Sequence, residues 1–184
     1  VEMTHNEDEF HPLAALAMLA GLVSGCGGDE AFLEKAEEAR KHLQLSEDEE
    51  ALSVLSSIDD TSAPPEFRYL KSITLFRLGR TEAAGSEIAL AVEAAPENPK
   101  YKGMQILLRL MAKDRDAMDQ LLELNEKYAA VGAVAFFATY GFHAKASVLH
   151  QANKPKSADY HTSRSRQTLA TAMTLRESIT EFHP

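Results

Sequence analysis

The side chains best suited to chemistry in this sequence are seven histidines and one cysteine. His143 and His150 are seven residues apart, so on a helix they share a face but lie two turns apart, too far to hold one zinc ion without ligands between them. Cys26 has no histidine or other base close to it in the sequence. The HExxH, P-loop, GxSxG and GxGxxG patterns are missing. We therefore expect no catalytic residue, no metal site, no cofactor and no small-molecule substrate, and a chain that is not an enzyme.

The overall composition is that of a folded domain or a short array of repeats, with 184 residues of which 45% are hydrophobic and 26% charged. There are 28 acidic and 19 basic residues, a net charge of −9. This charge argues against a general nucleic-acid binder, because such a protein needs a basic face to displace counterions from phosphates. A single cysteine excludes a disulfide within the chain. We expect protein partners and no nucleic acid.

The charges are unevenly distributed along the chain. Residues 29–60 hold eleven acidic and three basic side chains, whereas residues 145–184 hold six basic and three acidic ones. In an elongated fold these two segments give a dipole along the long axis. Two interpretations remain open: a surface kept soluble by its charge, or two ends that attract different partners.

The N-terminal segment contains an apolar run over residues 12–25, which is too short to span a bilayer but has the length of a signal-peptide core. The run ends in Val23, Ser24 and Gly25, directly before Cys26. This order of one aliphatic residue, two small residues and a cysteine resembles the lipobox of bacterial lipoproteins. The resemblance implies that Cys26 is lipidated, becomes the mature N-terminus and anchors the protein to a membrane of the bacterial cell envelope.

Residues 1–25 also allow two other interpretations. They could form an apolar helix that packs under the rest of a cytoplasmic protein, or an uncleaved segment associated with a membrane. With the lipoprotein hypothesis, the chain divides into a signal-peptide-like segment at 1–25, a short tether at 26–30 and a helical repeat domain at 31–184.

The clearest unit of that domain is residues 65–98, where apolar spacing predicts two helices separated by a turn at Gly79 and closed by Pro96. Ser72 is a small residue at the expected helix crossing, and Ala84 and Ala91 are small residues in the second helix. A 34-residue unit of this kind resembles a tetratricopeptide repeat (TPR).

The neighbouring units match this pattern less well. Residues 31–64 lack the turn glycine, and residues 99–132 have Lys113 in its place. Two further helices are expected at about 131–151 and 157–181. Since one helix pair cannot bury its apolar face alone, the expected fold is all-α: a right-handed α-solenoid of antiparallel, TPR-like helix pairs with a C-terminal capping helix.

The TPR resemblance implies a concave groove lined by the first helix of each unit. Its expected positions are Glu66, Tyr69, Ile73, Phe76 and Arg77 in the clearest unit, and Lys100, Gly103, Leu107, Leu110 and Met111 in the next. This apolar and aromatic strip with basic ends suits a bound peptide or amphipathic helix. The alternative is that much of the strip is core between repeats.

A second candidate surface is the aromatic stretch at residues 136–142, which is either core or a patch facing a partner. Together these patterns predict a non-catalytic protein–protein interaction scaffold, lipid-anchored in the envelope. The alternative is a soluble TPR-like adaptor, or an accessory subunit of a larger membrane complex in which the apolar N-terminus packs in the fold or an interface.

Overall fold

The computed structural model describes residues 26–57 and 62–175, and within these ranges the regular elements are eight helices and no strand. Their bounds are α2 Cys26–Gln44, α3 Asp48–Leu55, α4 Pro65–Arg77, α5 Thr81–Ala94, α6 Pro99–Met111, α7 Arg115–Lys127, α8 Gly132–Gln151 and α9 Pro155–Leu175. None of these described helices is both long and apolar enough to cross a membrane.

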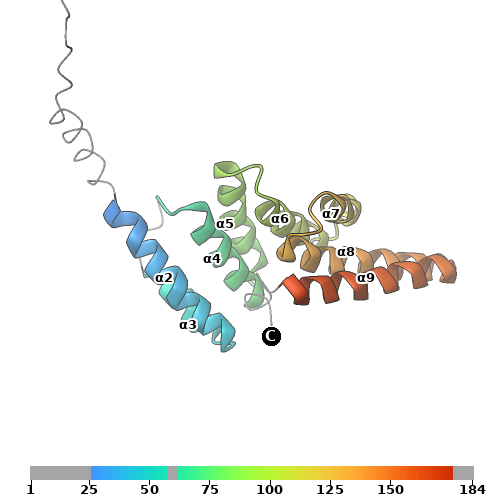
Figure 1. The fold of residues 1–184 in the computed structure, drawn as a ribbon, viewed down its shortest axis with the longest axis horizontal. Coiled ribbons are helices and arrows are strands. Elements are labelled where there is room, and N and C mark those ends of the chain that lie inside the picture. Colours follow the sequence, from blue (N-terminus) through green and yellow to red (C-terminus); the bar gives the residue numbers. More distant parts are fainter. Residues whose placement is uncertain (1–25, 58–61, 176–184) are drawn as a thin grey trace, which may run out of the picture.

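The helices form four consecutive pairs, α2–α3, α4–α5, α6–α7 and α8–α9, which stack side by side in chain order (Figure 1). Each helix packs on the next one in the sequence, and the first helices of neighbouring pairs also meet, α2 with α4 and α6 with α8. The expected all-α solenoid of helix pairs is confirmed.

The turn inside each pair contains one residue with a positive φ angle: Ser46 (59°), Gly79 (72°), Lys113 (68°) and Asn153 (54°). All four close their turns with the same left-handed conformation, although only one of them is a glycine. The pairs that lack the turn glycine therefore keep the backbone geometry of the repeat, which the sequence pattern did not reveal.

The helix starts follow from local chemistry. Proline occupies the first position of both α4 and α6, where its missing N–H needs no partner. The side chain of Asn98 accepts a hydrogen bond from the backbone N–H of Lys100 (3.0 Å), and that of Asp114 accepts one from Asp116 (3.0 Å).

The hydrophobic core has two parts. The smaller one joins α2 and α3 to α4 and contains Phe32, Ala36, Ala39, Leu43, Ala51, Leu55, Phe67 and Leu70. The larger one runs from α3 to α8 and includes Tyr69, Ile73, Ile88, Tyr101, Met104, Leu107, Leu121 and Phe137. The array is therefore held together by side chains shared between successive pairs.

Two small residues set how closely the helices approach. Ser72 is fully buried where α4 crosses α5, and its hydroxyl donates a hydrogen bond to the carbonyl of Ala84 (2.9 Å), which confirms the expected crossing. Gly103 of α6 lies under Phe137 of α8: a Cβ on Gly103 would be 2.5 Å from the Phe137 ring.

The final pair differs from the others in length and in packing. Helices α8 and α9 have 20 and 21 residues, against 13 in each of α6 and α7, and their far end extends beyond the array (Figure 1). The buried residues of α9 are all small: Ala158, Ser165, Thr168 and Ala172.

At the N-terminal side, residues 26–30, the segment expected as a short tether, are helical and are the first described residues of α2. The expected signal-peptide-like segment, residues 1–25, lies outside the described residues.

Candidate interaction surface

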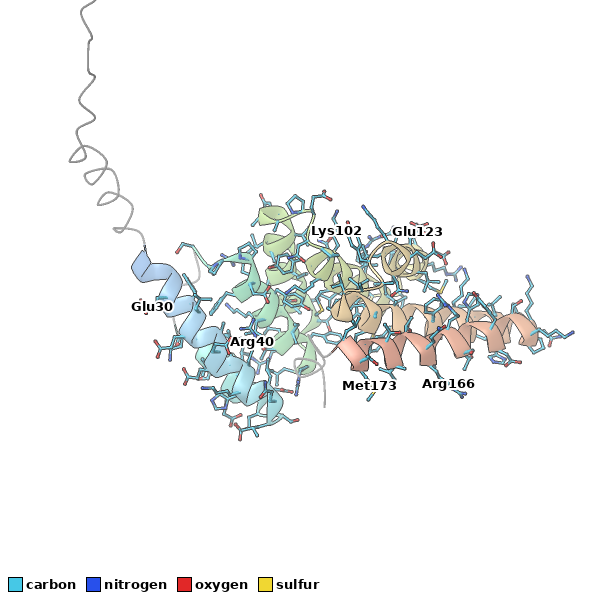
Figure 2. All side chains as sticks on the ribbon, in the orientation of Figure 1. Glu30, Arg40, Lys102, Glu123, Arg166 and Met173 are labelled. Carbon is cyan, nitrogen blue, oxygen red and sulfur yellow. The ribbon has the colours of Figure 1, made fainter. Side chains whose placement is uncertain are left out.

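Glu66 joins the first helices of three successive pairs. Its carboxylate accepts hydrogen bonds from Arg40 of α2 (3.2 Å), and from Lys100 (3.1 Å) and the Tyr101 hydroxyl (2.9 Å) of α6. Figure 2 marks Arg40 on α2 and Lys102 on α6, the helices on either side of α4. The expected groove positions Glu66 and Lys100 therefore do meet, but they bind each other, and both are half-buried.

Two tyrosines lie next to this ion pair. The Lys100 ammonium is 5.3 Å from the ring centre of Tyr69 and 6.0 Å from that of Tyr101, and the two rings are 5.3 Å apart. Burial raises the pKa of Tyr101 far above its usual value, and the negative charge of Glu66 and its hydrogen bond raise it further. The cluster thus holds a neutral phenol that donates to a carboxylate.

Three expected groove residues are instead core residues. Tyr69, Ile73 and Leu107 have no exposed surface, and their side chains fill the space between α4 and α6. Gly103 is also buried, beneath Phe137. The prediction that these positions line an open groove is corrected: their side chains are buried in the core that successive repeats share.

Arg77 and Phe76 also serve the fold. The guanidinium of Arg77 forms an ion pair with Asp48 at the start of α3 (2.8 Å), and its side chain is only 8% exposed. Phe76 is half-buried and packs against the larger core. Among the ten expected groove positions, Met111, at the end of α6, is the most accessible, with 52% of its surface exposed.

The aromatic stretch of α8 divides between core and surface. Phe137 and Phe142 are buried, while Phe136 is half-buried and Tyr140 is 38% exposed. The rings of Phe136 and Tyr140 make an edge contact with centres 5.6 Å apart. Core packing therefore accounts for two of the four rings, and Tyr140 remains on the surface.

Comparison with known proteins gives one structural neighbour. A solved structure described as "MamA MSR-1 C2" superposes with a TM-score of 0.53 at 15% sequence identity, covering 74% of this chain and 95% of that one. MamA is a TPR-like protein. The fold is TPR-like. No family model and no curated protein sequence matches the chain.

In the described part of the TPR-like chain, no group of three or more His, Cys, Asp or Glu side chains could hold a metal ion. His143 and His150 are exposed on α8. The charged side chains around Glu66 pair with one another across helices, which orients the repeats. The exposed large apolar side chains of the described residues include Met111, Tyr140 and Val148.

Proposed function

We propose that the chain is a non-catalytic scaffold that binds a peptide or helix of a partner protein and is anchored in a bacterial cell envelope through a lipid on Cys26. The carrying observation is the TPR-like solenoid itself, in which four helix pairs pack in chain order and present an extended surface (Figure 1). Solenoids of this type use such surfaces for extended partners.

The partner surface lies toward the C-terminal half of the array. Near Glu66 the helices are tied by internal ion pairs, whereas farther along Met111 and Tyr140 expose apolar surface. Exposed aromatic and methionine side chains are typical anchors in protein interfaces. The expected binding strip is therefore shorter than the TPR resemblance implied.

A pair of matched substitutions tests binding. Met111→Asp places a charge on the proposed surface, and Leu90→Asp does the same on α5, where Leu90 is 44% exposed. Partners captured by crosslinking in the native host and then purified should lose affinity for the first variant and keep it for the second. Equal binding by both variants would contradict the proposed surface.

The lipid anchor draws support from the sequence around Cys26. The intact mass of the protein from its native host tests this. A chain that begins at Cys26 and carries acyl mass is expected, and Cys26→Ala should abolish both cleavage and membrane retention. An unlipidated species that keeps residues 1–25 would favour the soluble adaptor instead.

A further inference from the structure

A pocket lies where the α8–α9 hairpin extends past the end of α6. Gly103 of α6 contacts Phe137 of α8. Seven residues farther along each helix, Leu110 and Ala144 line this pocket together. Helix α6 stops at Met111, but α8 continues to Gln151, so the last turns of α8 project over the turn between α6 and α7. The space beneath them is about 600 Å³, enough for one or two large side chains.

The floor of this overhang pocket is apolar. It is formed by Leu110, Met118, Ala144 and Val148, and Val148 is 52% exposed at the edge. Apolar surface in a hollow of this kind gains most from an inserted aliphatic or aromatic side chain.

The rim of the overhang pocket is basic. Lys113 and Arg115 line it, are exposed and, among the described residues, pair with no carboxylate. The third charged lining residue, Asp114, is already bound by Arg109 (2.6 Å), and this contact lowers the pKa of Asp114. Lys154 and Lys156, at the nearby α8–α9 turn, are likewise exposed and unpaired within the described ranges.

The acidic groups nearby only partly offset these cations. Asp119 forms an ion pair with Lys145 (2.9 Å). The other exposed carboxylates of the adjoining helices are Asp116, Glu123 and Glu126 on α7 and Asp159 on α9, and none of these four lines the pocket. The rim therefore remains positive on a chain whose net charge is −9. An acidic partner would be repelled by most of the molecule and attracted here.

We propose that the overhang pocket binds an acidic amphipathic helix of a partner protein, with one large apolar side chain in the pocket and its carboxylates on Lys113 and Arg115. This inference rests on the proposed scaffold function and names the chemistry of its partner. The apolar anchor supplies burial, and the two unpaired cations supply orientation and a faster association rate.

The test is an NMR titration of the full isotope-labelled chain with a short synthetic helix that carries one Phe flanked by Glu residues. Amide shifts should concentrate around Leu110, Lys113, Met118 and Val148, and binding should weaken with added salt. A peptide with Lys in place of Glu, or Ala in place of Phe, should bind at least roughly tenfold more weakly.

Charge-reversed variants supply the matched control. The double variant Lys113→Glu, Arg115→Glu should lose binding by roughly tenfold or more, whereas Lys41→Glu, Arg166→Glu reverses two exposed cations outside the pocket and should bind normally. Figure 2 marks Arg166 on α9. Val148→Asp should also abolish binding, with Leu90→Asp as its control. Melting temperatures show that each variant is folded.

Three outcomes would overturn the inference. Shifts at another apolar hollow, about 350 Å³ between α5 and α6 beside Gly85 and Ile88, would place the contact elsewhere and leave the scaffold function standing. If the acidic peptide does not bind but the native partner still does so in a Met111-dependent way, the acidic chemistry of the partner is rejected and the scaffold function is not. Salt-sensitive self-association that the double variant abolishes would make a second copy the occupant. Loss of all partner capture would instead contradict the scaffold function.

Discussion

Between α4 and α6, large side chains fill the space between the helices, whereas between α8 and α9 small side chains let the two backbones approach. Tyr69, Ile73, Tyr101 and Leu107 make the first contact. In the second, the Ser165 hydroxyl donates to the Thr139 carbonyl (3.1 Å), and the hydroxyls of Thr139 and Thr168 are 3.2 Å apart. The two regions should therefore respond oppositely to changes in side-chain volume.

The difference also separates the roles of the two regions. The contact from α4 to α6 joins repeats and carries the ion pairs of Glu66, so it sets the shape of the array. The α8–α9 hairpin packs on α6 and α7 mainly through α8 and leaves much of α9 exposed. Damage at α4–α6 should affect the whole array, and damage at α8–α9 should stay local.

The largest effect is expected for Tyr69→Ala. The ring is fully buried between α4 and α6, so its removal leaves a cavity and should lower the free energy of unfolding by roughly 3–5 kcal/mol. Chemical denaturation measures this. Tyr160→Ala, on a ring that is 60% exposed, should change stability by less than about 0.5 kcal/mol. If both substitutions cost the same, Tyr69 is not a core residue and the groove interpretation returns.

The opposite change should damage the hairpin. Ala158 is fully buried in α9, and Ala158→Leu should cost about 1–3 kcal/mol by forcing α8 and α9 apart. Ala170→Leu is the control, because Ala170 is exposed on the same helix. Hydrogen exchange should show faster exchange confined to α8 and α9 in the first variant. Uniformly faster exchange along the chain would mean that the hairpin is not a separate unit.

The next prediction concerns the charge cluster at α4–α6. Glu66→Gln removes a negative charge beside Tyr101, so the pKa of Tyr101 should fall toward its ordinary value of about 10. Ultraviolet absorbance of the phenolate measures this, with Tyr101→Phe to assign the signal. Tyr140 is a matched reference, since burial raises its pKa without a contribution from Glu66. An unchanged Tyr101 titration would mean that burial alone keeps this phenol neutral.

The same contact gives stability a defined dependence on pH. A raised tyrosine pKa stabilises the folded state fully below pH 10, and this contribution is lost as the pH rises above 10, where the unfolded chain ionises first. The loss should be smaller in Glu66→Gln. At neutral pH this variant should cost no more than about 1 kcal/mol, because the Glu66 side chain is 39% exposed and its ion pairs are screened by solvent.

The sequence predicted the helices and their order because apolar spacing, proline starts and the turn at Gly79 are local signals. The helix expected at 131–151 is observed at Gly132–Gln151. The groove was less predictable, because the TPR resemblance gives the direction of a side chain and not the distance to the next helix. Tyr69 and Leu107 are fully buried in a core to which α3 through α8 contribute. The overhang pocket depends on how far α8 extends past the end of α6. This overhang follows from the contact of Phe137 with Gly103, which aligns the two helices and is not a local signal in the sequence.

The smallest expected effect tests why the repeats tolerate poor matches to the TPR pattern. Lys113 holds the left-handed conformation that Gly79 holds in the preceding pair, and a side chain there is strained. Lys113→Gly should therefore stabilise the chain by about 0.5–1 kcal/mol. Gly79→Lys should destabilise it by a similar amount. A Cβ at position 79 would meet no atom within 4 Å, so the cost comes from backbone strain and not from a clash. Asn153→Gly should gain less, because asparagine adopts this conformation more readily. Thermal melting of the three variants measures the order. A loss of stability in Lys113→Gly would show that the lysine side chain stabilises its turn by contacts that outweigh the strain.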